Sequence, residues 1–389
     1  MTTERIDTVV VGAGQAGLAI GFHLARRGRP FVLLDAHERV GDAWRQRWDS
    51  LRLFTPARYD ALPGSRFPGS PWAFPSREEF SDYLERYAAA HALPVRTGTR
   101  VRRLAREGSG FVAEIDGGRL LADHVVVAAG FDRLPQTPAF STELEPSITQ
   151  VHSAEYRNPA QLPDGDVLVV GAGNSGADIA LELSRTHQVH LSDRHPGQVP
   201  FRIERPSSRV PSLLVFAAFS HVRTTRTPMG RRARAQVLAH SGPLIRVKTA
   251  DLAAAGVHRV PRVVGVRDGL PVTDDGRTLS VSSVVWCTGY RPDHSWIDLP
   301  VLGTDGLPVH ERGVCASQPG LYFLGQMFQY SLASSMIHGV GRDAKYVADH
   351  LDRVASRSTA PGGRLGRPAS DHPERHQDSG AEPTGVPAA

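Results

Sequence analysis

The chain has 389 residues, of which 40% are hydrophobic and 22% are charged, so it is long enough to form two globular domains of ordinary size. Its two cysteines, Cys287 and Cys315, form no CxxC pair, which excludes a disulfide scaffold, a cysteine-built zinc site and a dithiol redox motif. The longest apolar run, Leu213 to Phe219, is far shorter than the roughly 20 residues that span a bilayer. Because the N-terminus also lacks an apolar leader, the sequence predicts a soluble, cytoplasmic protein without a membrane span.

The net charge of +5 is concentrated in one segment. Between Arg202 and Arg234 there are eight arginines and a single acid, Glu204. Two interpretations stay open: a solvated arginine-rich face, or a positive field that attracts a phosphorylated cofactor. Nucleic-acid binding is not favoured, because no helix-turn-helix, zinc-finger or base-stacking motif accompanies the charge.

Two stretches of the chain repeat one pattern. Residues Ile6 to Asp35 show an apolar strand, a glycine turn, a helix and a second apolar strand, and Val167 to Leu191 show the same order. Each is typical of the opening β-α-β unit of a nucleotide-binding domain. After the first unit the sequence predicts a loop, a helix and three strands, in the order Gly41–Pro75, Arg77–His91, Val101–Leu104, Phe111–Ile115 and Val125–Ala129.

The last predicted elements return to the first sheet. They are the apolar strands Val281–Cys287 and Leu321–Leu324 and the helix Ser334–Leu351. We therefore expect an α/β fold with two Rossmann-type dinucleotide-binding domains, the second inserted in a discontinuous first. The expected limits are 1–153 and 283–354 for the first domain, 154–282 for the second, and 355–389 for a disordered tail that is poor in large apolar residues.

The first fingerprint, VVVGAGQAG, has a G-x-G-x-x-G spacing directly after a strand. Gly12 forms the tight turn, Gly14 lets the backbone approach a pyrophosphate, and Gly17 lets helix and strand pack closely. Asp35 ends the next strand, where its carboxylate can accept both hydroxyls of a ribose. With strand, helix and acid in this order, the pattern predicts a dinucleotide site.

The second fingerprint, VLVVGAGNSGADIA, places its glycines at Gly171, Gly173 and Gly176. Counted without gaps, Arg194 corresponds to Asp35, and a guanidinium there would pair with the 2′-phosphate of NADPH. A loop shorter by one or two residues would instead put Asp193 or Ser192 in that position, and Asp193 would repel the phosphate. The spacing favours NADPH and leaves NADH open.

Two further segments, Val125 to Pro135 and Val284 to Asp293, each end an apolar strand with a small residue, a glycine and an aromatic residue. Such strand ends lie where the chain crosses between two domains. The sequence contains no GxSxG nucleophile motif and no spacing typical of metal ligands, so we expect no metal and assign no catalytic side chain.

Residues 5 to 352 resemble the class B flavin-dependent monooxygenases, and most of all their compact branch of bacterial flavoproteins and plant indole-3-pyruvate monooxygenases. Beside the two fingerprints, the resemblance rests on GDAWRQRWDSLRLFTPARYDALPG, VHSAEYRNP, WCTGYRPDHSWI and PGLYFLGQ. It implies FAD on the first fingerprint, NADPH on the second, and oxygenation of a small organic molecule by O2 through a flavin C4a-hydroperoxide.

The fingerprints and the resemblance together indicate one set of cofactor-binding residues. For FAD and the flavin side these are Gly12, Gly14, Gln15, Ala16, Gly17, Asp35, Gly41, Trp44, Val101, Gly130, Thr288, Gly289, Gly325 and Gln326. For NADPH they are Gly171, Gly173, Asn174, Ser175, Gly176 and Arg194. Trp44 could stack near the flavin or pack its own loop. The oligomeric state stays open.

The sequence departs from the family pattern in three places. His152 and Tyr156 of the identifier F-x-G-x-x-x-H-x-x-x-Y are present, but Pro146 and Ile148 replace its Phe and Gly. Phe54 stands where animal-type enzymes have an active-site Asn, and Gln326 replaces an Asp that holds the ribityl chain in many relatives. His152 fits a linker that positions the domain crossover better than an acid or base. The alternatives to a monooxygenase are an NAD(P)H-dependent flavin reductase or oxidase, and a redox-sensing flavoprotein.

Overall fold

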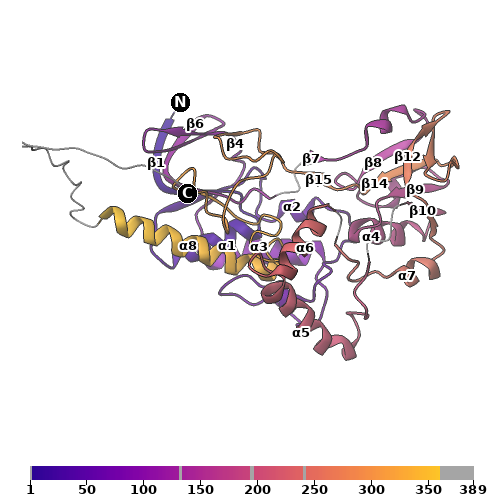
Figure 1. Cartoon of the computed structure of the whole chain (residues 1–389), viewed down its shortest axis with the longest axis horizontal. Coiled ribbons are helices and arrows are strands. Elements are labelled where there is room, and N and C mark those ends of the chain that lie inside the picture. The colour runs from indigo at the N-terminus through magenta and orange to yellow at the C-terminus, as the bar shows by residue number, and fades with distance from the viewer. Residues whose placement is uncertain (1, 131–133, 193–196, 240–241, 360–389) are drawn as a thin grey trace, which may run out of the picture. The chain divides into compact units, whose positions relative to one another are not determined.

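Two sheets organise the computed structural model, which describes residues 2–130, 134–192, 197–239 and 242–359 (Figure 1). The described residues up to Leu351 form one compact unit, and a second unit begins at Asp352. The larger sheet has eight strands in the order β16-β4-β5-β6-β1-β2-β3, with β17 also paired to β6. Its strands are β1 (Thr2–Val11), β2 (Phe31–Leu34), β3 (Val95–Arg96), β4 (Val101–Glu107), β5 (Gly110–Ile115), β6 (Gly118–Val127), β16 (Ile297–Asp298) and β17 (Leu321–Phe323).

Strand β6 connects the antiparallel and the parallel parts of the larger sheet. Its first half pairs antiparallel with β5, and its second half, from Val125, pairs parallel with β17, while β1 runs parallel along its other side. The parallel part is buried on both faces, as sheets covered by helices require. The expected return of Leu321–Leu324 to the first sheet is therefore confirmed.

The second sheet has five parallel strands in the order β11-β10-β9-β14-β8. They are β8 (Thr149–His152), β9 (Val167–Val170), β10 (Val189–Ser192), β11 (His258–Val260) and β14 (Ser283–Trp286). Two short antiparallel ribbons complete the strands: β12 (Val263–Arg267) with β13 (Leu270–Thr273), and β7 (Leu134–Pro135) with β15 (Tyr290–Arg291).

One predicted assignment is wrong. The sequence analysis placed residues from 283 onward in the first sheet, but β14 lies between β9 and β8 in the second. All four residues of β14 are buried, because it is a central strand with a neighbour on each side. An apolar run of this kind is compatible with either sheet, so its composition could not decide between them. The strand β8, which precedes the expected limit at residue 153, is also part of the second sheet.

The helices are α1 (Gln15–Ala25), α2 (Asp42–Arg45), α3 (Arg77–Ala90), α4 (Asn174–Leu183), α5 (Arg209–Ala217), α6 (Pro228–Ala239), α7 (Thr249–Ala254) and α8 (Ile337–Thr359). The short helical turns are η1 (Ala57–Tyr59), η2 (Ala139–Glu143), η3 (Pro159–Gln161), η4 (Pro206–Ser208) and the π-helical turn η5 (Ala218–Val222). Helix α8 includes five residues that were expected in the tail. The rest of that predicted tail, residues 360–389, lies outside the described residues.

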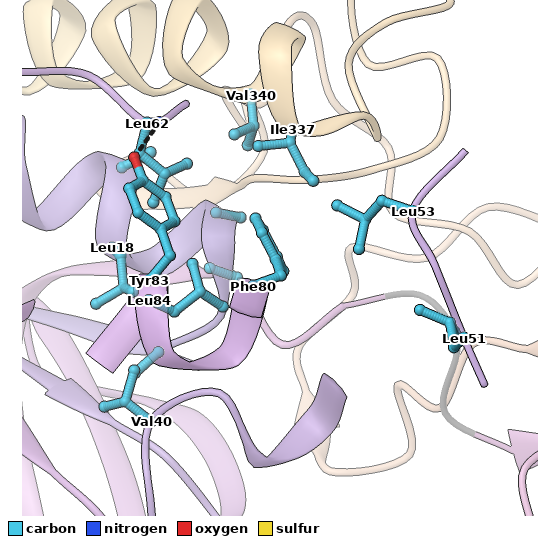
Figure 2. Packing of buried hydrophobic residues seen from close by; sticks show 14 of the residues in the cluster. Leu18, Val40, Leu51, Leu53, Leu62, Phe80, Tyr83, Leu84, Ile337 and Val340 are labelled. Atoms are coloured by element: carbon cyan, nitrogen blue, oxygen red, sulfur yellow. Dashed lines mark hydrogen bonds between the residues drawn. The ribbon is translucent and has the colours of Figure 1, made fainter. Parts of the chain in front are cut away.

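The main core packs α1, α3 and α8 against one another, as Figure 2 shows for Leu18, Phe80 and Val340. Tyr83 on α3 accepts a hydrogen bond from the Leu62 amide at 2.7 Å, which fixes the loop before α3 to the helix. Ser76 begins α3 with a capping box, because its hydroxyl accepts from the Glu79 amide and the Glu79 carboxylate accepts from the Ser76 amide. The loop that carries the tryptophan-rich motif is thus held at its C-terminal end.

A long excursion, residues 197–248, leaves the second sheet between β10 and β11 and carries α5, η5 and α6. Its base is closed by Lys248, whose buried ammonium donates to the carbonyl oxygens of Val199 at 3.0 Å and Ile245 at 2.7 Å. Burial lowers the pKa of Lys248, although Asp251 opposes the shift. The excursion contacts the segment before α8: the Thr225 amide donates to the Tyr330 carbonyl oxygen at 2.8 Å.

Candidate functional site

At two positions of the first fingerprint, only glycine avoids a collision with the surrounding backbone. Gly12 turns the chain after β1 with a φ of +104°, and a Cβ there would collide with the backbone of Ala128 on the neighbouring strand. A Cβ at Gly17 would overlap the carbonyl oxygen of Gly12, so α1 can approach β1 only with glycine at this position.

Gly14 differs from both, because a Cβ there would meet no atom within 4 Å. It is the N-cap of α1, and its φ of −75° is accessible to any residue. The protein itself therefore does not demand glycine at position 14. Open space at the N-terminus of an eleven-residue helix is what a pyrophosphate needs, so the loop fits an FAD phosphate.

Asp35 ends β2 beside this loop. Its carboxylate accepts hydrogen bonds from the Ala13 amide at 2.7 Å, the His37 amide at 2.9 Å and the His37 Nδ1 at 2.8 Å. Burial raises the pKa of Asp35, but the hydrogen bonds from His37 and Ala13 outweigh it and leave the pKa below its usual value. The carboxylate is thus ionised and fixed next to the fingerprint. Sequence reasoning missed His37, since a histidine two residues after the acid is no recognised part of the motif.

Two predicted residues from later in the chain, Trp44 and Gly325, also lie near α1. The Trp44 Nε1 donates to the Gln15 Oε1 at 3.4 Å, and the Trp44 ring packs edge-on against Phe80 at 4.9 Å between ring centroids. A Cβ on Gly325 would lie 3.0 Å from the Ala16 Cβ, so the turn after β17 reaches the first turn of α1. Trp44 thus contacts α1 and α3, and these contacts are compatible with both interpretations, a neighbour of the flavin or a packing residue.

The remaining predicted residues of the FAD side are more scattered. Gly41 is the N-cap of α2, and a Cβ on it would lie 2.7 Å from the Ser81 carbonyl oxygen. Val101 is buried at the start of β4, and the turn at Gly130 is open, because nothing lies within 4 Å of a Cβ there. Gln326 is buried, and its backbone N–H donates to the Gln329 Oε1 at 3.3 Å.

The second fingerprint repeats the geometry of the first. Gly171 turns the chain after β9 with a φ of +108°, and a Cβ there would collide with the carbonyl of Cys287 after β14. A Cβ on Gly176 would overlap the Gly171 carbonyl oxygen. Gly173 is the N-cap of α4, and Ser175 is exposed in its first turn.

The Asn174 side chain makes contacts that the sequence did not predict. Its Nδ2 donates to the Pro243 carbonyl oxygen at 3.1 Å, and its Oδ1 accepts from the Ile245 amide at 3.0 Å. The side chain thus ties the end of the excursion to α4. A short polar residue at a helix start is compatible with a phosphate or with such a tie, and the sequence pattern alone could not separate them.

Of the three candidates for the residue that selects between NADPH and NADH, the structure describes only Ser192. Ser192 ends β10, but its buried hydroxyl donates to the Pro261 carbonyl oxygen at 3.0 Å and accepts from the Val263 amide at 2.9 Å. It is therefore committed to the link with β12. The other two candidates, Asp193 and Arg194, lie outside the described residues.

The crossover between the two sheets is the antiparallel pair β7 and β15. His152 lies at this crossover: its Nδ1 accepts from the Ala154 amide at 3.1 Å, so its Nε2 donates to the Gly289 carbonyl oxygen, also at 3.1 Å. Burial lowers the pKa of His152, and with both nitrogens engaged the ring is neutral and fixed. Thr288 donates to the Gln136 carbonyl oxygen across the same pair. These contacts match a positioning residue rather than an acid or base.

An aromatic cluster forms where the excursion meets the tryptophan-rich loop and the segment before α8. We use this name for Phe54, Tyr59, Phe216, Phe219, Phe328 and His338, together with the aliphatic side chains packed among them. Phe54, which replaces the Asn of animal-type enzymes, is a partly buried member. Sequence reasoning missed the cluster, because its members lie far apart along the chain and meet only through the tertiary fold.

Two polar residues with buried side-chain atoms lie in or next to the aromatic cluster. Both ring nitrogens of His338 are buried without a hydrogen-bond partner among the described residues, and burial lowers its pKa to about 4. Asp60 follows η1, and burial raises its pKa to about 8, although a hydrogen bond from the Thr55 hydroxyl opposes the shift. Both groups are therefore neutral near pH 7.

Two of the clefts on the described surface contain no fingerprint glycine. One, of about 310 Å³, lies between residues 49–52 and α4 and is lined by the Asp178–Arg246 ion pair. The other lies at the edge of β1 and β2. Among the described residues there is no cluster of His, Cys, Asp or Glu suited to a metal ion.

Two dinucleotide-binding folds with paired crossover strands define an oxidoreductase that uses two dinucleotides. The family described as pyridine nucleotide-disulphide oxidoreductase matches residues 9–325. An uncharacterized CzcO-like oxidoreductase of Geobacillus kaustophilus is 38% identical over 349 residues, which cover 89% of this chain and 98% of that protein. The indole-3-pyruvate monooxygenase YUCCA1 of rice is 32% identical over 327 residues, covering 76% and 80% of the two chains.

A flavin-containing monooxygenase from Stenotrophomonas maltophilia superposes with a TM-score of 0.75 at 28% identity, covering 90% of this chain and 99% of that one. The chain belongs to the pyridine nucleotide-disulphide oxidoreductase family and, within it, to the class B flavin monooxygenases. The expected fold class and the cofactor pair FAD and NADPH are confirmed. None of the helices in the described part of the chain has the length and apolar character needed to cross a membrane.

Proposed function

We propose that this monooxygenase inserts one oxygen atom from O2 into a small organic molecule, with FAD held at the first fingerprint and NADPH at the second. The observation that carries the proposal is the pair of fingerprints, in each of which two glycines are demanded by packing, together with the open helix start at Gly14 in the first. The fold itself does not require glycine at position 14, because a side chain there would meet no protein atom. The glycine at this position is therefore explained by a ligand that approaches the backbone.

FAD would be held by the backbone of the loop from Gly12 to Gly17, with the ionised Asp35 on its ribose and the turn at Gly325 and Gln326 beside the flavin side. NADPH would be held by the start of α4, with Arg194 on its 2′-phosphate. We assign the chain from β1 to β6 and the chain from β16 onward to the FAD-binding domain, because β8 belongs to the second sheet. The inserted sheet that contains β14 is assigned to the NADPH-binding domain.

Reduced flavin is the group that activates O2 in this class, and the chain supplies binding, orientation and exclusion of water. The aromatic cluster suits the last of these tasks, because it covers the junction of the excursion and the tryptophan-rich loop with apolar side chains. A dry site suppresses premature loss of peroxide. His152 would hold the crossover in place without exchanging a proton, because both its nitrogens are engaged.

The proposal is tested by measuring NADPH consumption, O2 uptake and peroxide release together on the FAD-loaded protein. Candidate substrates are amines, thioethers, ketones and aromatic 2-oxo acids, the last because a rice relative carries the name indole-3-pyruvate monooxygenase. A substrate that is oxygenated should lower the peroxide released per NADPH consumed. Peroxide equal to NADPH with every substrate class would contradict oxygen insertion and identify an oxidase.

A further inference from the structure

Helix α5 is apolar on two opposite sides. Phe216 is buried in the aromatic cluster, and Ser212 beside it is buried with its hydroxyl bonded to the Ser208 carbonyl oxygen. On the other side Val210 is 65% exposed, Leu213 38% and Leu214 69%. A helix that is apolar all round is normally covered on every side, so an apolar face left in solvent indicates a surface that docks onto something else.

The exposed apolar surface extends beyond α5. The described chain has eight large hydrophobic side chains that are exposed, and five of them lie between residues 210 and 229. The two beyond α5 are Val222 on η5, 46% exposed, and Met229 on α6, 59% exposed. Scattered exposed hydrophobic residues are ordinary, but this concentration in one excursion is not. We call these five residues, Val210, Leu213, Leu214, Val222 and Met229, the docking face; α5 lies at the lower edge of Figure 1.

The excursion that carries the docking face is also rich in positive charge. Six exposed arginines occur in the same excursion, and none forms an ion pair with a described residue: Arg205, Arg209, Arg226, Arg231, Arg232 and Arg234. The one acid among them in sequence is Glu204. Elsewhere on the surface exposed arginines are often paired, as Arg102 is with Asp116 at 2.9 Å.

An aromatic ring joins this surface from the other domain. The partly exposed Trp72, in the tryptophan-rich loop, lies under two guanidinium groups, Arg58 at 4.8 Å and Arg209 at 5.5 Å from its ring centroid. Tryptophan flanked by arginine is typical of the headgroup level of a bilayer, where an apolar body and a cation are both accommodated.

We propose that the docking face binds the surface of an anionic lipid bilayer, with the apolar side chains of α5 in the headgroup boundary and the arginines on lipid phosphates. Short helices with an apolar face and a cationic border bind membranes in this way. A second copy of the chain fits the same surface poorly, because a two-fold interface would place these arginines against their own equivalents. An acidic protein would satisfy the arginines but not the aliphatic side chains.

The test uses the full-length FAD-loaded protein in co-sedimentation with phosphatidylcholine vesicles, with and without phosphatidylglycerol. Wild type should sediment with the anionic vesicles and remain in solution with phosphatidylcholine alone, and binding should weaken as salt increases. The triple variant Val210→Ser, Leu213→Ser, Leu214→Ser should bind the anionic vesicles about tenfold more weakly or more weakly still, because the apolar contact is lost. Replacing Arg231, Arg232 and Arg234 by Gln should have a similar effect.

The chain offers matched controls. Val264, Leu302 and Val309 are exposed to a similar degree outside the excursion, at 52%, 39% and 60%, and their change to Ser should leave vesicle binding unchanged. Arg86, Arg100 and Arg267 are exposed arginines for the corresponding charge control. Flavin content and melting temperature identify any variant that fails to fold.

Two results would overturn the proposal. One is that wild type does not sediment with anionic vesicles, or that the control variants lose binding as much as the docking-face variants. The other is a dimer, detected by analytical ultracentrifugation, that the α5 variant dissociates while vesicle binding is absent in both. The measurement needs no substrate and no turnover, so it is independent of the proposed oxygenation.

Discussion

Replacing Gly14 by valine should remove FAD and leave the fold intact. The added Cβ meets no protein atom within 4 Å, and the φ of −75° suits valine, so nothing in the protein opposes the side chain. It would instead occupy the space at the start of α1 in which a pyrophosphate is expected. The variant should therefore be purified colourless, while wild type is yellow and releases FAD.

The expected size of the effect follows from the contacts at stake. A hydrogen bond to a charged group contributes about 1.5–3 kcal/mol, so losing two backbone contacts to the pyrophosphate lowers FAD affinity by roughly 10²- to 10⁴-fold. Bound FAD at a hundred times its Kd stabilises the fold by about 2.7 kcal/mol, and the variant loses this as well. Melting temperatures must therefore be compared between the flavin-free forms, where they should agree within a few degrees.

Two matched variants separate the possible causes. Gly265→Val adds the same side chain in equally open space on β12, away from both fingerprints, and should keep FAD. Gly17→Ala should instead unfold or destabilise the protein, because its Cβ overlaps the Gly12 carbonyl oxygen. Full FAD retention in a folded Gly14→Val protein would refute the placement of the pyrophosphate at this loop.

Four further substitutions test the site and its support. Folding raises the pKa of Asp60 from 3.8 to about 8, so the folded state holds the proton more tightly and stability falls as pH rises through this window; Asp60→Asn should flatten that fall between pH 4 and 8 in thermal melts. Lys248→Met leaves buried carbonyl oxygens at the base of the excursion unpaired and should cost about 2–4 kcal/mol, measured by denaturant unfolding, with earlier proteolysis inside residues 197–248. Arg194→Ala should raise the KM for NADPH by about tenfold or more and leave NADH unaffected, and equal losses for both cofactors would contradict the register. Asp193→Ala, which should weaken NADH binding if Asp193 holds the ribose, completes that comparison.

The parts of the fold that the sequence could predict are those that local sterics impose. Gly17 and Gly176 are required because any side chain would meet the backbone of the preceding turn, and Gly12 and Gly171 because it would meet the backbone at the end of a neighbouring parallel strand. Such constraints act within a few residues or between adjacent parallel strands, so they can be read from spacing. The same is true of α3, which begins at the predicted Arg77, directly after its capping residue Ser76.

The parts that could not be predicted depend on which distant elements meet. Strand β14 carries the same apolar pattern whichever sheet it joins, and its partners β9 and β8 lie more than a hundred residues away in sequence. The burial of the Asp60 carboxylate and the His338 ring nitrogens likewise follows from tertiary packing, since an acid in a loop or a histidine at a helix start is ordinarily exposed. Asn174 was predicted to contact a cofactor because of its position in the motif. The sequence gives no indication that its side chain would contact Pro243, which lies 69 residues away.

The arginine-rich segment shows the limit of charge as a guide. Counting residues gave eight arginines against one acid and could not distinguish a solvated face from a field for a cofactor. The structure adds that α5 within this segment is apolar on the side that the protein leaves uncovered. An arginine face that served solubility alone would have no reason to carry Val210 and Leu214 at its centre, because exposed aliphatic side chains oppose solubility. The combination of cation and uncovered apolar surface, rather than the charge itself, is what indicates a lipid surface as the partner.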